Sequence, residues 1–316
     1  MTNTYIISGF LGAGKTTFIQ KMLAEAFEGQ KVALIENDFG EISVDAALLK
    51  GQAAITEINS GCICCSLSGN FVSALQDLLE RIAPEVILIE PSGVGKLSDI
   101  VSACESEELR DKINLAKKIT IVDAKRGEMY LENFGEFFEN QVQYADAIVF
   151  SHTQTADAAP LMTLLQEVNP EVEFINQPWE NLDMLALLNM VQPRHEHVHA
   201  NGEECSDEGC HCHEHAEGEH HHHNHAAEEV FETLSLQPQR VFTAQQLESK
   251  LESLQDKQRY GTILRAKGFV KTTNGMVAVQ YVPAEYKLEK TAECPPLLNI
   301  IGSDLNLAEI EALFTV

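Results

Sequence analysis

The sequence predicts an α/β protein with a doubly wound, mostly parallel sheet, followed by a smaller α+β domain. Short apolar runs alternate with amphipathic stretches over the first 190 residues, a histidine-rich acidic tract follows, and strand and helix patterns then resume. Alternating strands and helices are typical of a parallel sheet that helices cover on both faces. The 316 residues suffice for two domains. We expect these domains at residues 1–190 and 230–316, joined by a linker at 191–229.

Apolar runs predict the strands of the first domain. They lie at residues 4–9, 31–36, 85–90, 118–123 and 146–151. Their nearly continuous apolar character is expected of parallel strands buried on both faces. A helix is predicted ahead of the third run, because its apolar residues recur on one helical face. These residues are Phe71, Leu75, Leu78, Leu79 and Ile82. A further strand is expected at 171–176 and a further helix at 181–190.

The tract at residues 195–225 has almost no large apolar residue and cannot bury a core, which predicts a disordered linker. Eleven of the twelve histidines fall in it, together with Cys205, Cys210 and Cys212. Such a segment can bind several borderline metal ions without a fixed geometry, so it would store metal or pass it on. The alternative is a solvated linker whose histidines are incidental.

The residues after the tract predict a small α+β domain. Strands are expected at 230–236 and 297–302, and a hairpin at 262–270 and 275–282. A helix is expected at 243–255 with Thr243 as its N-cap. A last helix is expected at 306–314, where Asn306 and Glu309 have the spacing of a capping box.

The segment GFLGAGKTT at residues 9–17 fits the phosphate-binding pattern G-x-x-x-x-G-K-[ST], and it lies between a predicted strand and an amphipathic helix. The backbone N–H groups of such a loop and the N-terminus of the following helix bind phosphate. We expect Lys15 to reach the β- and γ-phosphates of a nucleotide, and the Thr16 hydroxyl to ligate Mg²⁺. The nucleotide-binding residues of this loop would be Gly9, Gly12, Ala13, Gly14, Lys15, Thr16 and Thr17.

A phosphate-binding loop also needs a carboxylate near Mg²⁺. Glu90 follows four apolar residues in VILIEPSG, and Gly93 lies three positions later, where a γ-phosphate sensor would sit. The alternative is a carboxylate that simply faces solvent at a strand end. We therefore predict Lys15, Thr16 and Glu90 as the catalytic residues.

The composition of the chain bears on its cellular location and on the classes of partner that it can bind. The sequence starts without a signal-peptide pattern and has no apolar run of about 18 residues, so we expect a cytoplasmic protein without a membrane partner. The formal net charge of −26 argues against a nucleic-acid partner bound through phosphates. Cytoplasmic cysteines are mostly reduced, which favours metal or redox roles over disulfides.

Three cysteines lie close together in GCICC: Cys62, Cys64 and Cys65. Adjacent cysteines rarely meet disulfide geometry, whereas thiolates suit Zn²⁺ and Cu(I). Tetrahedral zinc would then need one more ligand or a water. A buried structural thiol cluster and a redox pair are the alternatives.

GFLGAGKTT, IENDFGE, GCICC, IEPSG and RAKGF occur here in the order found in CobW-type GTPases. The sequence therefore resembles this family of P-loop metallochaperones, which is related to the nickel-insertion GTPases of urease and hydrogenase. The resemblance covers nearly the whole chain. It implies a GTPase that binds GTP and Mg²⁺ and carries Zn²⁺, or Co²⁺ or Ni²⁺, to a client metalloprotein, with self-association into a homodimer as a further option.

The resemblance also implies site residues. Cys62, Cys64 and Cys65 match the internal metal site of the family, and Glu36 and Glu41 match acidic positions that contribute to it. The family reads guanine with an [NST]-K-x-D motif. The aligned residues here are Ser151, His152, Thr153 and Gln154, so the lysine and the aspartate are replaced.

The replacement at Gln154 bears on nucleotide choice. A carboxylate accepts from both guanine N1–H and N2–H₂, whereas a glutamine amide is also complementary to adenine. Asp157, three residues later, is an alternative source of the carboxylate that the motif lacks at position 154. Four functions follow: a GTPase metallochaperone, which we favour; a metal buffer or sensor with little or no turnover; an NTPase that prefers ATP; and a small-molecule kinase. No lid or second basic phosphate clamp is evident for the kinase.

Overall fold

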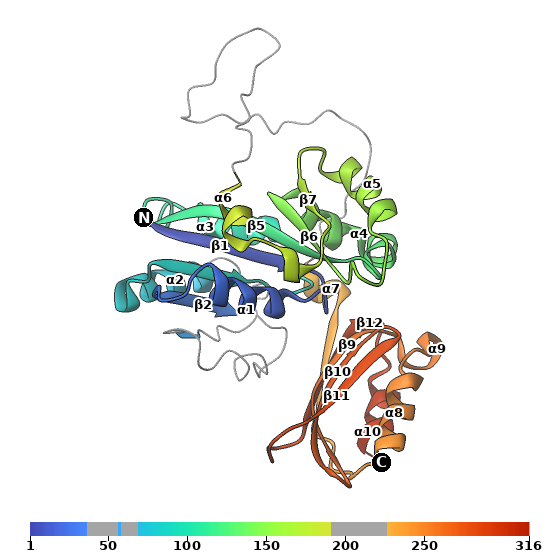
Figure 1. The fold of residues 1–316 in the computed structure, drawn as a ribbon. Coiled ribbons are helices and arrows are strands. Elements are labelled where there is room, and N and C mark those ends of the chain that lie inside the picture. Colours follow the sequence, from blue (N-terminus) through green and yellow to red (C-terminus); the bar gives the residue numbers. More distant parts are fainter. Residues whose placement is uncertain (37–55, 58–68, 191–225, 316) are drawn as a thin grey trace.

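The computed structural model describes residues 1–36, 56–57, 69–190 and 226–315. Within these ranges seven strands form one sheet in the order β3-β2-β4-β1-β5-β6-β7 (Figure 1). Every neighbouring pair is parallel, which confirms the predicted doubly wound α/β fold. The strands are β1 Thr2–Gly9, β2 Val32–Glu36, β3 Thr56–Glu57, β4 Val86–Glu90, β5 Ile113–Asp123, β6 Ala147–Ser151 and β7 Glu173–Ile175.

Helices cover both faces of this sheet because β1, β2, β4 and β6 are buried and apolar on both sides. Ile7 of β1 packs with Phe18 and Leu187 on the face covered by α1 and α6, whereas Ile6 packs with Leu75 and Ile100 on the opposite face. The helices of this part are α1 Lys15–Glu25, α2 Gly69–Ile82, α3 Leu97–Cys104, α4 Gly127–Gln143, α5 Ala159–Val168 and α6 Met184–Asn189, with a 3₁₀ turn η1 Trp179–Asn181 before α6.

A buried lysine holds α6 against the sheet. The Lys117 side chain is 2% exposed, and its ammonium donates hydrogen bonds to the carbonyls of Leu187 (2.9 Å) and Met190 (3.0 Å). Burial lowers the pKa of Lys117, and the nearby Glu173 and Asp146 oppose this effect. A cation at the C-terminus of a helix satisfies carbonyls that have no partner inside the helix. Lys117 is therefore a structural residue.

The C-terminal residues form an antiparallel sheet of five strands in the order β11-β10-β9-β12-β8. The strands are β8 Glu232–Leu236, β9 Thr262–Thr272, β10 Gly275–Val282, β11 Glu285–Lys290 and β12 Leu297–Ser303. The helices are α8 Ala244–Ser253, α9 Lys257–Tyr260 and α10 Leu307–Thr315. Leu247 and Phe314, on α8 and α10, pack with Val270 and Ile300 of the sheet. The predicted α+β domain is confirmed, as is Thr243 as the N-cap of α8. Gln246 completes a capping box there that the sequence did not predict.

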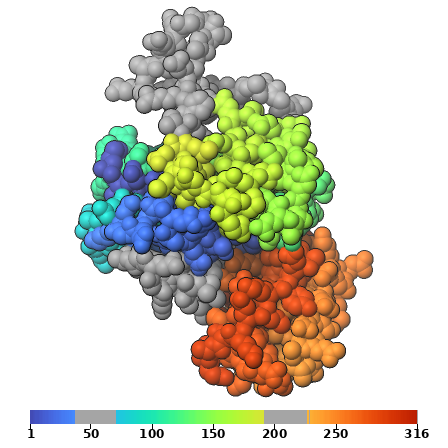
Figure 2. All heavy atoms as spheres, in the orientation of Figure 1, coloured from blue at the N-terminus to red at the C-terminus, as the bar shows by residue number. Residues whose placement is uncertain are grey.

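The two sheets meet through a short helix, α7 Ala227–Val230, and the aromatic residue that follows it. Phe231 is 2% exposed and lies 5.4 Å from the Phe134 ring and 5.0 Å from the Phe137 ring, centroid to centroid. Leu264 of β9 and Ile301 of β12 join the same apolar cluster. Figure 2 shows the C-terminal residues, orange to red, as a second lobe packed against the first.

Within the described ranges, none of the helices combines the length and the apolar character that crossing a bilayer needs.

Candidate functional site

The phosphate loop joins β1 to α1 at the carboxyl edge of the parallel sheet, where ligands of open α/β sheets bind. Gly14 stands at the N-cap of α1 with φ of 104°, a conformation that side chains rarely adopt. The backbone N–H of Phe18 donates to the Gly14 carbonyl at 3.0 Å, which closes the first helical turn. The predicted strand–loop–helix context is therefore present, and the loop backbone can approach a phosphate closely.

Lys15 lies on the loop but is only 6% exposed. Its ammonium donates to the carbonyls of Gly9 (2.8 Å) and Phe10 (3.4 Å). The cation is thus held inside the curve of the loop, where the β- and γ-phosphates of a nucleotide would lie.

Thr16 and Glu90 come together at the ends of adjacent segments. The Thr16 hydroxyl lies 3.2 Å from Glu90 Oε1 and 3.4 Å from Oε2. They meet because β4 pairs with β1 in parallel, so that the end of β4 lies beside the loop after β1. A hydroxyl next to a carboxylate is an oxygen-rich donor set, which suits Mg²⁺.

Gly93 approaches the loop so closely that no side chain fits there. A Cβ at this position would lie 2.9 Å from the backbone nitrogen of Leu11 and 3.0 Å from the Lys15 ammonium nitrogen. The backbone after Glu90 therefore passes close to the Lys15 ammonium.

Of the predicted zinc ligands, only Glu36 is described. It ends β2, is 6% exposed, and stands opposite Glu90 in the β2–β4 register. Cys62, Cys64, Cys65 and Glu41 lie outside the described residues, as does the tract at 195–225. In the part of the chain that the structure describes, no group of three or more His, Cys, Asp or Glu side chains is placed to hold a metal ion.

A pocket of about 300 Å³ lies beside the phosphate loop. Its lining residues are Ala13, Gly14, Thr17, Ser151, His152, Thr153, Gln154, Thr155, Pro178, Trp179 and Glu180. The predicted base-reading segment from Ser151 to Gln154 thus lines a cavity together with loop residues Ala13 and Gly14. Asp157 is engaged elsewhere, because its carboxylate accepts from the Ala159 N–H at the start of α5 (3.0 Å).

Trp179 and Glu180 are pocket residues that sequence reasoning missed. The Trp179 indole donates to the Phe150 carbonyl at 2.8 Å, and its ring lies edge-on to Phe18 at 5.4 Å. Glu180 accepts a hydrogen bond from Gln154 Nε2 at 3.1 Å. The only signal in the sequence is that Trp179 is the single tryptophan and lies four residues after the end of the last strand of the parallel sheet.

A second cavity of about 530 Å³ opens between the phosphate loop and the C-terminal sheet. Lys15, Thr16 and Glu90 line one side of it, and Arg265 and Lys267 of β9 line the other. A Cβ at Gly12 would lie 2.4 Å from Cγ1 of Val282, so β10 packs directly on the loop. The RAKGF segment therefore brings two cations to the side of the cavity that faces the loop.

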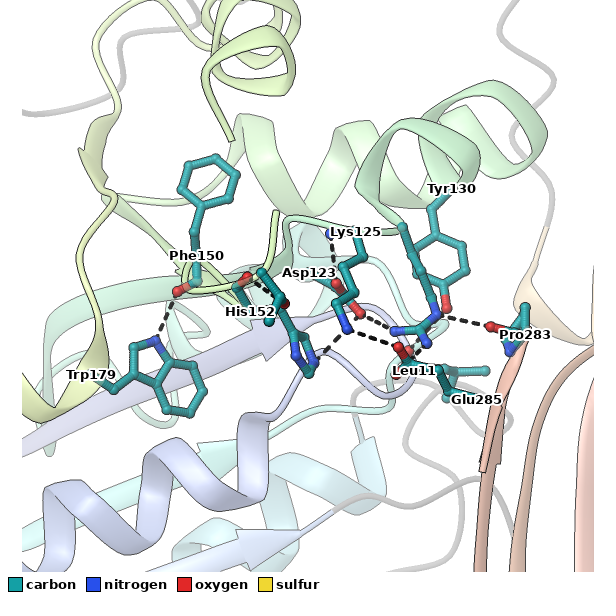
Figure 3. A network of polar contacts seen from close by, with 11 residues as sticks. Leu11, Asp123, Lys125, Tyr130, Phe150, His152, Trp179, Pro283 and Glu285 are labelled. Atoms are coloured by element: carbon teal, nitrogen blue, oxygen red, sulfur yellow. Dashed lines mark hydrogen bonds and ion pairs between the residues drawn. The ribbon is translucent and has the colours of Figure 1, made fainter. Parts of the chain in front are cut away.

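An ion-pair cluster joins the two lobes next to this cavity. The Arg126 guanidinium contacts Asp123 Oδ2 (2.6 Å) and Glu285 Oε2 (2.7 Å), and Lys125 contacts Glu285 (2.8 Å). Figure 3 shows His152 between this cluster and the Trp179–Phe150 pair, and His152 Nε2 lies 3.9 Å from Asp123 Oδ2.

The charges of the cluster stabilise one another. Hydrogen bonds from Lys125 and Arg126 lower the pKa of Glu285 to about 2. Burial lowers the pKa of Arg126, but the hydrogen bonds and charges of Glu285 and Asp123 outweigh it and raise that pKa above its usual value. The cluster thus fixes β11 beside the end of β5.

Together, a buried lysine, a hydroxyl–carboxylate pair and a base-sized pocket can bind a nucleoside triphosphate and Mg²⁺. Two family models match the chain: "CobW/HypB/UreG, nucleotide-binding domain" over residues 3–176, and "Cobalamin synthesis protein cobW C-terminal domain" over residues 231–316.

The chain is similar to curated relatives. It is 33% identical to Zinc chaperone CobW of Sinorhizobium sp over 193 residues, which cover 52% of this chain and 54% of that protein. It is 34% identical to Zinc chaperone YjiA of Escherichia coli K12 over 192 residues, which cover 58% and 60%. The matches thus span between half and two thirds of these relatives' length.

Solved structures are similar as well. The Zn(II)-bound YjiA GTPase from E. coli matches with 22% identity and a TM-score of 0.46, over 99% of this chain and 98% of that one. HypB from Helicobacter pylori in complex with nickel matches with 16% identity and a TM-score of 0.42, over 55% and 77%. The first family model matches more than half of the residues of the chain, and the second matches the C-terminal domain that follows. The chain therefore belongs to the CobW/HypB/UreG family of nucleotide-binding proteins.

Proposed function

We propose that this protein is a metal-binding GTPase that works as a metallochaperone, coupling GTP hydrolysis to the delivery of Zn²⁺, or of Co²⁺ or Ni²⁺, to a client metalloprotein. The observation that carries the proposal is the Thr16 hydroxyl beside the Glu90 carboxylate on a complete phosphate loop. Family membership supports it, and so do relatives that bear the name zinc chaperone.

We assign a separate function to each part of the chain. Residues 1–190 would bind and hydrolyse the nucleotide, residues 191–229 would form a metal-binding linker, and residues 230–316 would form the CobW-type C-terminal domain. The ion pairs of Glu285 with Lys125 and Arg126 support a C-terminal domain that rests on the nucleotide site.

In the nucleotide site, Lys15 would bind the β- and γ-phosphates, while Thr16 and Glu90 would hold Mg²⁺. Bound Mg²⁺ neutralises charge on the phosphates during transfer. Gly93, next to the Lys15 ammonium, would place a backbone N–H group at the terminal phosphate. Ser151, His152 and Gln154 would line the space for the base.

Metal ions are the cargo in this proposal. Cys62, Cys64 and Cys65 would bind one ion, with Glu36 and Glu41 as further candidate ligands. Glu36 supports a link to the nucleotide, because it stands opposite the Mg²⁺ carboxylate Glu90 in the β2–β4 register. A movement of Glu90 on hydrolysis would then be transmitted to Glu36, and so to the metal site, through the pairing of β4 with β2.

The proposal is tested by measuring phosphate release from GTP and from ATP by the full chain, with and without Zn²⁺. We expect GDP and inorganic phosphate as products, faster turnover of GTP than of ATP, and dependence on Mg²⁺. Zinc binding without hydrolysis would instead indicate a metal buffer or sensor, and faster use of ATP would indicate an ATPase. A phosphorylated small molecule would reveal a kinase.

A further inference from the structure

We propose that Glu180 is the carboxylate that reads the guanine base, in place of the aspartate that the segment from Ser151 to Gln154 lacks. The inference rests on the proposed function, because it presumes a nucleotide whose phosphates lie on the loop around Lys15. It adds a specificity residue that lies 26 positions after Gln154 in the chain and follows a different strand.

The topology of the sheet brings the two segments together. β6 ends at Ser151 and β7 at Ile175, and the two strands pair in parallel. The residues after both strands therefore emerge at the same edge, next to the phosphate loop after β1. Gln154 and Glu180 both line the pocket of about 300 Å³ that also contains Ala13 and Gly14 of that loop.

The backbone that carries Glu180 is held in place by its neighbour. The Trp179 indole is hydrogen-bonded to the Phe150 carbonyl of β6 (2.8 Å), and its ring packs against Phe18 of α1 (5.4 Å). A 3₁₀ turn follows, in which the Leu182 N–H donates to the Trp179 carbonyl at 3.2 Å. Glu180 thus stands on a turn that the anchored Trp179 holds in place, as a specificity residue requires.

The hydrogen-bond chemistry favours guanine. Guanine presents two donors side by side, N1–H and N2–H₂, and a carboxylate can accept from both. The bond from Gln154 Nε2 to Glu180 Oε2 uses one of about four lone-pair sites of the carboxylate and holds it beside Gln154 in the lining of the pocket. Gln154 is then a positioning residue rather than the base reader.

The same contact weakens the case for adenine. Glutamine recognises adenine by using its amide oxygen and its amide nitrogen at once. In this structure the nitrogen of Gln154 donates to Glu180 at 3.1 Å. An aspartate at position 154 would lie against the Glu180 carboxylate, where two like charges repel each other.

The test compares diphosphates that differ only at the base. Calorimetry would measure the binding of GDP, of inosine diphosphate, which lacks the 2-amino group, and of xanthosine diphosphate, which has an oxygen there. We would compare wild type, Glu180→Gln, Glu180→Ala and the control Glu167→Gln on an exposed position of α5. Ratios between nucleotides are used, because a partly unfolded sample lowers all affinities together.

In the wild type we expect GDP to bind best. Glu180→Gln should lower the ratio of GDP to xanthosine diphosphate affinity by roughly 5- to 150-fold, since the new amide donates to the xanthine oxygen and faces the guanine amino group. Glu180→Ala should remove the advantage of GDP over inosine diphosphate, and Glu167→Gln should change neither ratio.

Two results would overturn the inference, and they differ. If GDP binds the wild type and both Glu180 variants with unchanged ratios, Glu180 does not read the base, while the proposed function stands. If the wild type does not bind guanine nucleotides at all, both the inference and the proposed function are wrong.

Discussion

The Thr16 hydroxyl lies within 3.4 Å of both carboxylate oxygens of Glu90, linking the first turn of α1 to the last residue of β4. This contact joins the phosphate loop to the strand whose continuation, at Gly93, passes close to Lys15. It also defines the place where a metal ion would meet the nucleotide.

Glu90→Gln should weaken the response to Mg²⁺ more than it weakens nucleotide binding. The amide keeps the size of the side chain but removes the negative charge that favours the cation. The Mg²⁺ concentration for half-maximal GTP turnover should rise by about 10- to 100-fold, as for outer-shell ligands in metal sites. Glu80→Gln, on an exposed position of α2, serves as the control and should leave the Mg²⁺ titration unchanged.

Lys15→Ala should lower the rate of GTP turnover by at least about 10²- to 10³-fold, because it removes a cation that stabilises charge in the transition state. The folded structure should persist, since the ammonium is hydrogen-bonded to carbonyls of its own loop, those of Gly9 and Phe10. Lys21→Ala, which removes a lysine paired with Glu25 further along α1, is the matched control. Equal turnover in a folded Lys15→Ala protein would contradict the assignment.

The cluster around Arg126 should stabilise the protein in a pH-dependent way. The pKa of Glu285 is lowered to about 2, below its usual value of about 4.3. Its contribution to the free energy of unfolding is therefore complete above about pH 4.3 and is lost as the pH falls toward 2. Because its side chain is 46% exposed, Glu285→Gln should cost only about 0.2–1 kcal/mol at pH 7. The free energy of unfolding of this variant, measured by urea unfolding, should also change less between about pH 4.3 and pH 2 than that of the wild type.

Arg126→Gln should cost more than Glu285→Gln, about 3–5 kcal/mol, because Asp123 would lose its counter-charge. Asp123 is only 2% exposed, so water cannot replace the guanidinium. Urea unfolding at pH 7 compares the two variants, with Arg259→Gln at the exposed pair with Glu309 as the control. Similar losses for Arg126→Gln and Glu285→Gln would mean that Asp123 does not depend on Arg126.

Replacing residues 195–225 by a Gly/Ser segment of equal length should leave GTP turnover largely unchanged and lower the number of metal ions bound per chain. The reason is that nearly all histidines lie in this tract, whereas the proposed nucleotide site is built from residues 9–17, 90–93 and 151–180. Equilibrium dialysis followed by elemental analysis counts the ions. An unchanged count would show that the tract does not store metal.

The parallel sheet could be predicted because its strands are continuous apolar runs, as in β1, β2, β4 and β6. The edge strand β11, Glu285–Lys290, could not, because its sequence EYKLEK is charged and exposed. Charged edges prevent sheets from pairing with other chains, which hides them from hydrophobic patterning. The length of β5 was also underestimated, since Asn114 and Lys117 interrupt its apolar pattern.

The proposed nucleotide site also contains parts that could be predicted from the sequence and parts that could not. Residues next to one another in the chain, from Gly9 to Thr17, were predictable from spacing alone. Thr16 and Glu90 were both predicted near Mg²⁺, because a phosphate-binding loop needs a carboxylate at a strand end, and the structure places them in contact. The Gln154–Glu180 and Arg126–Glu285 contacts were not, because they depend on which strand ends lie side by side and on how the second sheet packs against the first.

The most direct test of the metallochaperone proposal is the affinity for Zn²⁺ in two nucleotide states. It would be measured with a non-hydrolysable GTP analogue and with GDP, in a chain whose 195–225 tract is replaced. If nucleotide and metal sites are coupled, the two affinities should differ by roughly 5- to 150-fold. The difference should vanish when Cys62, Cys64 and Cys65 are all changed to serine. Equal zinc affinity in both nucleotide states would contradict a nucleotide-driven metal carrier.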